Sequence, residues 1–244
     1  MLILDAKEVT KRFGGLTAVN RVSMQVEEGQ VYGLIGPNGA GKSTFLNAVV
    51  GRFPPTEGAV YFSGEETTGL SSEIMCHKGM ARTFQIPRPF PRLSVLENVK
   101  VGVIFGSLDK DPIPADERAK EILEFVDFTL PIDTPADRLN AVQLKRIDLA
   151  RALACKPKLL LLDELASGLT PGELDSIMSL ILKIREQGVS IIAVEHIMRV
   201  IKGICDTVMV IEYGTTIAEG TPDEVLNNPD VIKAYLGEEE AENA

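Results

Sequence analysis

Hydrophobic and polar residues follow different periods in successive parts of the chain. Over residues 2–35, valine, leucine and isoleucine alternate with polar residues, which favours antiparallel strands leading into a short apolar run at 31–35. Farther on, apolar residues recur at helical spacing and predict two amphipathic helices, over residues 116–128 and 141–155. The first part of the chain is therefore expected to be β-rich and the middle part helical.

The C-terminal third alternates short apolar runs with helical segments. The runs at 159–162, 189–194 and 207–211 are expected to be strands, because continuous apolar residues are typical of strands buried on both faces. Helices are expected between them, at 172–187 and 197–203. Strands that alternate with helices pair in parallel through right-handed crossovers. We therefore expect an α/β fold built on a parallel sheet.

The helical middle of the chain interrupts this core. We expect a single domain over residues 1–244, in which 1–85 and 156–244 form the α/β core together with an antiparallel β subdomain. Residues from about 86 to 155 would form an inserted helical subdomain. Three prolines between residues 87 and 91 exclude a helix at the very start of this insertion.

A glycine-rich segment follows the apolar run at 31–35 and precedes an expected helix. It matches the pattern G-x-x-x-x-G-K-[ST] at every position and reads Gly36-Pro37-Asn38-Gly39-Ala40-Gly41-Lys42-Ser43-Thr44. Such a loop points backbone N–H groups at a chain of phosphates. Lys42 would add a charge for the β- and γ-phosphates, and the Ser43 hydroxyl could ligate Mg²⁺. A chance match, expected in roughly one chain of this size in a hundred, is the alternative, and the flanking strand and helix count against it.

Two carboxylates follow the apolar run at 159–162. Asp163 is expected to hold Mg²⁺ through water, and Glu164 to act as the general base that polarises the attacking water. Ligands of open α/β sheets bind beyond the carboxyl ends of the strands, so both side chains should lie near the glycine-rich loop. An Asp-Glu pair at a strand end can also be an ordinary transition into a loop, and the phosphate-binding loop favours the catalytic interpretation.

Composition narrows the range of partners and compartments. The formal net charge of −10 argues against a nucleic-acid partner, which needs a basic surface. The three cysteines form no C-x-x-C pair, so neither zinc nor a disulfide framework is expected, and a reducing cytoplasm fits. Asp5, Lys7 and Glu8 interrupt the first apolar run, so no signal peptide is expected. The sequence contains no run of about 18 apolar residues, so no membrane-spanning segment is expected.

Further motifs stand in a fixed order around the loop and the two carboxylates. Gln85 follows an expected strand, Ser167-Gly168-Leu169-Thr170 follows Glu164, and His196 ends another expected strand. With these residues the chain resembles, over essentially its whole length, the nucleotide-binding subunit of an ATP-binding-cassette transporter. Several stretches are similar to importers of branched-chain amino acids in particular: residues 13–19, 33–43, 82–85, 97–99, 217–222 and 234–237. The resemblance implies a P-loop NTPase (RecA-like) core, with ATP and Mg²⁺ as cofactors.

The resemblance also implies a role for individual residues. Phe13 would stack on adenine and Val19 would line the nucleotide site, together with the loop from Gly36 to Thr44. The catalytic set would be Lys42, Gln85, Glu164 and His196, and the metal ligands would be Ser43, Gln85 and Asp163. Taken singly, Phe13 could be a core residue, Gln85 a polar cap on a strand and His196 a strand-end histidine.

One family motif is altered in this sequence. Where the family has Leu-Ser-Gly-Gly-Gln at the start of a helix, this chain has Leu139-Asn140-Ala141-Val142-Gln143. Asn140 can cap the helix, but Ala141 and Val142 place Cβ atoms where a phosphate held by the opposite subunit should approach. The change is either neutral drift or the mark of a pair of subunits with one impaired site.

The resemblance implies the partners and the activity. We expect a second ATPase subunit, identical or different, integral membrane permease subunits and, through them, a substrate-binding protein. The chain would lie at the cytoplasmic face of the inner (plasma) membrane as a peripheral subunit, with Phe90 and Leu93 anchoring a short permease helix. It would hydrolyse ATP to energise import of amino acids, branched-chain or related small substrates. The alternatives are an ATP-binding subunit with weak hydrolysis and a soluble cassette ATPase that takes no part in transport.

Overall fold

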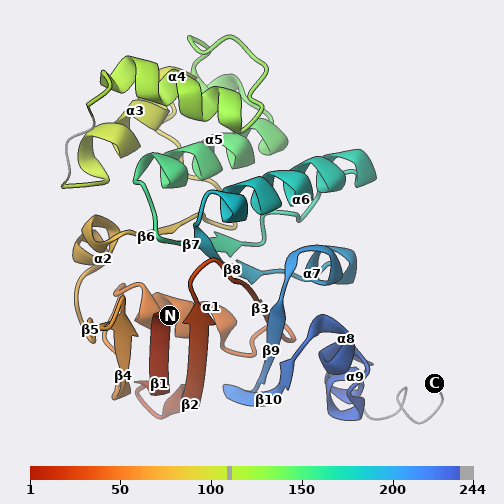
Figure 1. Cartoon of the computed structure of the whole chain (residues 1–244). Coiled ribbons are helices and arrows are strands. Elements are labelled where there is room, and N and C mark those ends of the chain that lie inside the picture. Colours follow the sequence, from red (N-terminus) through yellow and green to blue (C-terminus); the bar gives the residue numbers. More distant parts are fainter. Residues whose placement is uncertain (109–111, 237–244) are drawn as a thin grey trace.

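A six-stranded sheet forms the centre of the molecule. The computed structural model describes residues 1–108 and 112–236, so that Gly237 of the 234–237 stretch lies outside the described residues (Figure 1). The strands follow the order β10-β9-β3-β8-β7-β6 across the sheet. They are β3 (Val31–Ile35), β6 (Met80–Arg82), β7 (Leu159–Asp163), β8 (Ser190–Val194), β9 (Thr207–Glu212) and β10 (Thr215–Gly220). Only β10 pairs antiparallel within this sheet, so the expected parallel sheet is confirmed.

A four-stranded antiparallel sheet packs beside this central sheet. Its order is β2-β1-β4-β5. The strands are β1 (Leu2–Phe13), β2 (Leu16–Glu27), β4 (Glu57–Phe62) and β5 (Glu65–Glu66). β1 and β2 form a long hairpin, as the alternating pattern at the start of the chain predicts.

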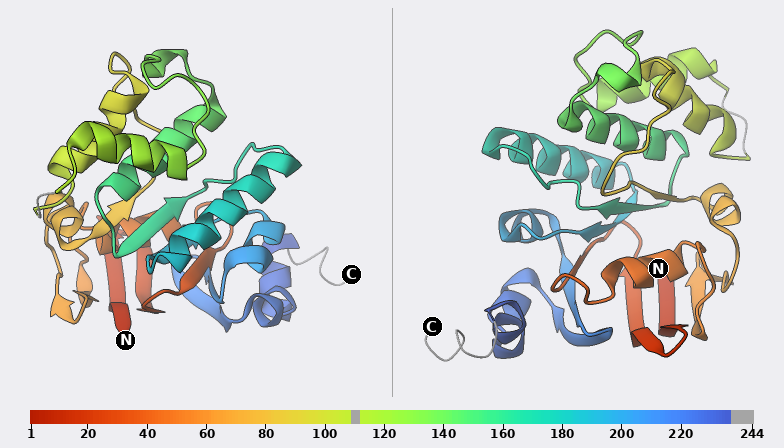
Figure 2. Two further views of the ribbon diagram at one scale, coloured as in Figure 1. Left: turned by 45° about the horizontal axis from the view of Figure 1, so that its top comes forward. Right: turned by 180° about the vertical axis from the view of Figure 1, so that it is seen from behind.

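The helices of the described residues form two groups (Figures 1 and 2). One group stands together at the end of the molecule farthest from the antiparallel sheet, and in sequence it lies between β6 and β7. It comprises α3 (Val95–Phe105), α4 (Ala115–Phe125), the short 3-10 helix η1 (Ala136–Arg138) and α5 (Ala141–Ala154). The other helices cover the two sheets: α1 (Lys42–Val49), α2 (Ser72–Lys78), α6 (Pro171–Glu186), α7 (Met198–Ile204), α8 (Pro222–Leu226) and α9 (Pro229–Leu236).

The proline-rich segment before α3 contains no helix, as its prolines require. The buried side chain of Asn98, on α3, fixes this segment to the helix. Its amide nitrogen donates to the carbonyls of Phe90, Leu93 and Ser94, and its oxygen accepts from the Phe90 N–H. Helix α3 itself was not predicted from the sequence. It begins with a capping box between Ser94 and Glu97, which satisfies backbone groups at both residues.

The central sheet separates two hydrophobic cores. On β7, Leu160 and Leu162 pack into the core shared with α3, α5 and α6, whereas Leu159 and Leu161 pack toward α1 and the antiparallel sheet. This alternation follows from the two-residue period of a strand. No helix among the described residues is both long enough and apolar enough to cross a membrane. The expected α/β architecture is confirmed, and so are the expected antiparallel sheet and helical group.

Candidate nucleotide-binding and catalytic site

Strand order brings the expected site residues to one edge of the central sheet. β3, β8, β7 and β6 are neighbours and run in parallel, so their carboxyl ends meet at the same edge. The glycine-rich loop follows β3, and Gln85, Glu164 and His196 follow β6, β7 and β8. These three residues, with Gly36, Pro37 and Asn38 of the loop, line one cavity of about 490 Å³. Glu164 thus lies beside the glycine-rich loop, as the strand-end argument predicts, whereas Asp163 does not line this cavity.

The glycines of the loop allow close backbone packing. Gly36 has a φ of 146°, and a Cβ there would stand 2.0 Å from the carbonyl oxygen of Ile211. Gly41 has a φ of 105°, and a Cβ there would stand 2.5 Å from the carbonyl oxygen of Ala18. At Gly39, which also has positive φ, a Cβ would meet nothing within 4 Å. The loop is therefore tightly held by the protein on one side and open at Gly39, where a ligand can approach the backbone.

Lys42 begins α1 and lies almost buried, with 6% of its surface exposed. Its ammonium group donates to the carbonyl oxygens of Gly36 at 2.6 Å and Pro37 at 2.9 Å, so the lysine closes the loop on itself. Burial lowers the pKa of Lys42, and the nearby carboxylates of Glu164 and Asp163 oppose that shift. The carboxylates therefore help to keep a cation beside the loop.

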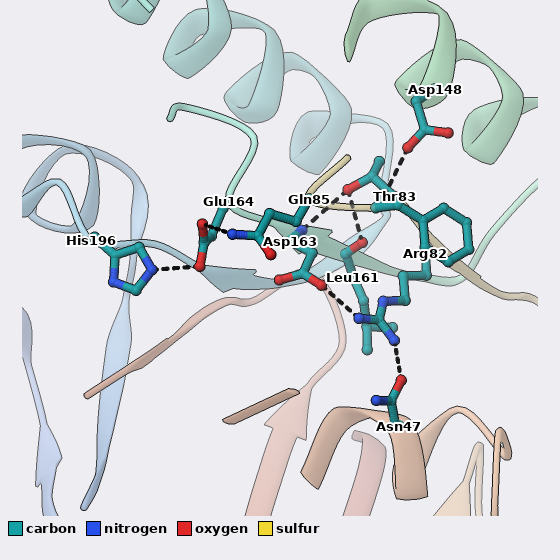
Figure 3. A network of polar contacts seen from close by, with 10 residues as sticks. Asn47, Arg82, Thr83, Gln85, Asp148, Leu161, Asp163, Glu164 and His196 are labelled. Carbon is teal, nitrogen blue, oxygen red and sulfur yellow. Dashed lines mark hydrogen bonds and ion pairs between the residues drawn. The ribbon is translucent and has the colours of Figure 1, made fainter. Parts of the chain in front are cut away.

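Glu164 is held through both of its carboxylate oxygens. The Gln85 amide donates to Oε2 at 2.6 Å, and the His196 Nε2 lies 2.5 Å from Oε1, as Figure 3 shows. Glu164 adopts a φ of 51°, in the left-handed region that non-glycine residues rarely occupy, and its N–H donates to the Val194 carbonyl. Such backbone strain is typical of functional sites, because the surrounding contacts must hold the residue in place. Three of the four residues expected to act in catalysis are therefore joined, because Glu164 contacts both Gln85 and His196.

Asp163 points away from this group and pairs with a residue that was not predicted. The Arg82 guanidinium lies 2.5 Å from the Asp163 carboxylate, and it also donates to the Asn47 side chain of α1 at 2.6 Å (Figure 3). The Asp163 and Arg82 side chains are only 9% and 13% exposed. A charged residue at the end of the short strand β6 is the sequence signal that could have pointed to Arg82, but its partner lies 81 residues away.

Phe13 and Val19 lie apart from the catalytic pocket. Phe13 is about half exposed (48%) and packs edge to face on Phe53, with 5.5 Å between ring centroids. Val19 is buried, and its methyl group lies 3.6 Å from the position that a Cβ of Gly41 would take. Val19 therefore supports the loop from behind, and the half-exposed ring of Phe13 also contacts the Lys11 ammonium, which lies 5.3 Å from its centroid. Neither residue lines the cavity that contains Glu164.

The altered signature segment begins α5 as expected. Asn140 caps the helix: its side chain accepts from the Gln143 N–H, and the Gln143 side chain accepts from the Asn140 N–H, both at 2.9 Å. Lys145, one turn on, donates to the carbonyls of Glu164, Leu165 and Ser167. Sequence reasoning assigned nothing to Lys145. The structure connects this helix to the turn that carries Glu164.

A second unpredicted contact joins α5 to the segment of Gln85. The buried carboxylate of Asp148 accepts from the Phe84 N–H at 2.8 Å and lies 3.8 Å from the Arg151 guanidinium. Burial raises the pKa of Asp148 to about 6, and the Phe84 and Arg151 contacts oppose the shift. Asp148 therefore ties the residue before Gln85 to the helical group.

Comparisons with known proteins agree with this geometry. The family model described as "ABC transporter" matches residues 19–167, and one described as "Branched-chain amino acid ATP-binding cassette transporter" matches residues 215–241. The chain is 41% identical to the high-affinity branched-chain amino acid transport ATP-binding protein BraF of Pseudomonas aeruginosa, over 97% of this chain and 98% of the relative. It is 36% identical to the corresponding protein LivG of Escherichia coli K12, with the same coverage.

Solved structures show the same likeness. A nucleotide-free ATP-binding cassette of an ABC transporter aligns with a TM-score of 0.88 at 32% identity, over 98% of this chain and all of that one. A cassette in its ADP conformation aligns equally well, at 33% identity. Fold, loop and sequence all point to nucleotide binding, and the chain belongs to the ABC transporter family of ATP-binding proteins.

Proposed function

We propose that this chain is the ATP-hydrolysing subunit of an importer whose cargo is a branched-chain amino acid or a related small substrate. The curated relatives, which are named for branched-chain amino acid transport, support the cargo, as does the family match at residues 215–241. One observation carries the hydrolytic role: both carboxylate oxygens of Glu164 are held, by Gln85 and His196, beside the phosphate loop. A subunit that only bound nucleotide would need no carboxylate oriented in this way.

Some residues around the loop bind the nucleotide, and others take part in hydrolysis. Loop amides and the Lys42 ammonium bind the phosphate chain, which is the anion that a helix N-terminus favours. Glu164 accepts the proton of the water that attacks the γ-phosphate, and its contacts with Gln85 and His196 fix the direction in which it can do so. His196 then hydrogen-bonds the γ-phosphate as charge develops on it. Phe13, which is half-exposed, would offer its ring to adenine.

The oxygen donors of the expected metal ligands suit Mg²⁺, and in this structure one of them, Asp163, is paired with Arg82. Ser43, Gln85 and Asp163 offer a hydroxyl, an amide and a carboxylate oxygen, which are the ligands that Mg²⁺ prefers. Within the described residues no cluster of His, Cys, Asp or Glu could hold a metal by itself. This suits an ion that takes one or two protein ligands and completes its shell with phosphate oxygens and water. When bound, Mg²⁺ would neutralise charge on the transferred phosphate.

A second cavity, of about 500 Å³, is the surface that we assign to the permease subunits. It lies between the core and the helical group, and its lining includes Phe84, Arg88, Phe105 and Arg151. Phe90 and Leu93, the anchors expected from the sequence, do not line it. The Phe90 ring instead packs under the Arg151 guanidinium, 5.1 Å from its centroid. Binding here would place the chain at the cytoplasmic face of the membrane as a peripheral subunit.

A weakly hydrolysing subunit is the second candidate, and the altered signature segment favours it. Ala141 is exposed and Val142 is half-buried, so their side chains are available to face a partner's nucleotide. In a homodimer both sites would meet this segment. In a heterodimer with an unaltered partner, only the partner's nucleotide would meet it, and the site at Lys42 and Glu164 would hydrolyse normally.

Replacement of the base tests the hydrolytic role. Glu164→Gln keeps the shape of the side chain but cannot accept the proton, so turnover should fall by roughly 10²-fold or more while ATP binding persists. Glu186→Gln, at the exposed C-terminal end of α6, is the matched control and should leave turnover unchanged. Both variants are assayed with the native permease and partner subunits. Equal turnover of Glu164→Gln and wild type would remove Glu164 from the role of base.

A further inference from the structure

Two of the three cysteines approach each other at one glycine in the wall of the cavity between core and helical group. Cys76 lies on α2 and Cys155 caps the end of α5. The Cys76 thiol donates to the carbonyl oxygen of Gly106, at 3.5 Å. The Cys155 sulfur lies 2.4 Å from the position that a Cβ of Gly106 would take. Both sulfurs therefore flank Gly106, although the two cysteines are far apart in the sequence.

Both thiols are accessible to small reagents from the cavity. They are half-buried, and each contributes to the lining of the cavity of about 500 Å³. Arg52, Arg88 and Arg151 line the same cavity, so its wall carries positive charge that favours an anionic reagent. Cys205, by contrast, is buried, and its sulfur lies 3.0 Å from the position that a Cβ of Gly33 would take, in the core of the central sheet.

The two thiols differ in reactivity. The neighbouring Cys155 sulfur lowers the pKa of Cys76 to about 7, while that contact and burial raise the pKa of Cys155, whose thiol donates to the Arg151 carbonyl at 3.4 Å. Thiolate is the attacking form, so Cys76 would react first with an oxidant and Cys155 would follow. This order is that of an attacking and a resolving cysteine.

We propose that Cys76 and Cys155 form a dithiol site that reacts with low-molecular-weight disulfides and closes to an intramolecular disulfide between α2 and α5. The Cys76 thiolate attacks one sulfur of the small disulfide, so that a mixed disulfide forms and one small thiolate leaves. The Cys155 thiol gives its proton to that thiolate and attacks the Cys76 sulfur, so that the mixed disulfide breaks. The second small thiolate leaves and takes from solvent the proton that Cys76 had lost. The two cysteines are oxidised by two electrons and the small disulfide is reduced to two thiols.

The bond would join the core to the helical group beside the cavity. α2 and β6 belong to the core side, and α5 carries both the signature segment and Asp148. A covalent tie at the end of α5 would restrict movement of this helix relative to the core. This consequence rests on the proposed function: oxidation should lower the turnover that the permease stimulates.

Oxidised glutathione is the probe for the site, used on the purified full chain. Wild type should lose two of its three free thiols, give one cross-linked peptide containing Cys76 and Cys155, and regain both thiols with dithiothreitol. Cys205→Ser should lose both of its thiols and give the same cross-linked peptide. Cys155→Ser should trap one glutathione on Cys76. Cys76→Ser should react roughly 10-fold more slowly, because burial raises the pKa of both remaining thiols.

Two results would overturn the proposal: retention of all three free thiols, or cross-links that contain Cys205 or join two chains instead of Cys76 to Cys155. A glutathione adduct on Cys155 in the Cys76→Ser variant at the wild-type rate would overturn the assigned order. Thiol mapping detects the disulfide whether or not the chain hydrolyses ATP. Failure of the proposed function would instead appear as absent ATP turnover in reduced wild type. With active protein, oxidation should reduce permease-stimulated turnover in wild type, and dithiothreitol should restore it.

Discussion

Replacement of Arg82 by methionine removes a buried cation from the expected metal ligand. In the structure the guanidinium contacts Asp163 at 2.5 Å and Asn47 at 2.6 Å, and the two charged side chains are 13% and 9% exposed. Removal of one partner from a buried ion pair costs about 3–5 kcal/mol, because the other charge stays buried without compensation. The small exposure of this pair places the expected loss at about 3 kcal/mol. Methionine preserves most of the length and volume, so little of this loss arises from a cavity.

Mg²⁺ should reverse much of this loss if Asp163 is its ligand. A ligand that binds only the folded state stabilises it in proportion to its affinity, and an unpaired Asp163 binds a cation more readily than one held by Arg82. The stabilisation gained on passing from ADP with a chelator to Mg-ADP should therefore be larger in Arg82→Met than in wild type. Arg82→Lys, which keeps the charge, should lie close to wild type in both conditions.

Urea denaturation measures the free energy of unfolding of the three proteins in each condition. If Arg82→Met without nucleotide has the same free energy of unfolding as wild type, the ion pair contributes nothing to stability. An equal gain from Mg-ADP in all three proteins, beside a clear loss without nucleotide, would show that Asp163 does not meet the metal. The two outcomes separate the structural part of the argument from the part that concerns the metal.

Three further predictions concern the loop, the helical group and the signature. Lys42→Ala should weaken Mg-ATP binding by roughly 10- to 100-fold, since a charge-assisted hydrogen bond contributes about 1.5–3 kcal/mol; equilibrium binding to the purified chain measures this. Burial raises the pKa of Asp148 from 3.8 to about 6, so the folded state binds the Asp148 proton more tightly than the unfolded chain does. The resulting contribution to the free energy of unfolding is fully present below pH 3.8 and is lost as the pH rises through 6. Between pH 5 and pH 8 wild type should lose about 1.4 kcal/mol relative to Asp148→Asn in urea denaturation, and parallel pH profiles would contradict this. Restoration of the family signature should raise ATPase activity of the isolated chain, by as much as about 10²–10³-fold, and equal steady-state rates would mean that the substitutions are drift. The restoring changes are Asn140→Ser, Ala141→Gly and Val142→Gly.

The parts of the fold that could be predicted are those in which local pattern and burial agree. β7 and β8 are continuous apolar runs, and the structure buries every residue of both strands. Helix α3 was missed for the opposite reason: its sequence, Val95–Phe105, is apolar on most sides and has no clear stripe. Its ends are set by the Ser94 cap and by packing on α4 and α5, which periodicity does not report.

Some features of the candidate site could likewise be predicted from the sequence, and others could not. Gln85, Glu164 and His196 could be placed together from the sequence, because each follows a strand of one parallel sheet. The contacts of Arg82 with Asp163 and of Asp148 with Phe84 could not, because each joins elements separated by more than 60 residues. Sequence pattern predicts which edge a residue occupies, whereas the choice of partner on that edge depends on side-chain packing.

The backbone of Glu164 explains how two successive carboxylates serve different partners. In a regular strand, Asp163 and Glu164 would point to opposite faces of the sheet. Glu164 follows the last residue of β7 and has a positive φ of 51°; its side chain contacts Gln85 and His196, while Asp163 contacts Arg82. Lys145 holds the same turn from α5, since it donates to the carbonyls of Glu164 and of two residues that follow. The helix whose first residues would face a partner's nucleotide thus also holds the turn that carries the proposed base, so any movement of α5 on assembly would act directly on the geometry of Glu164.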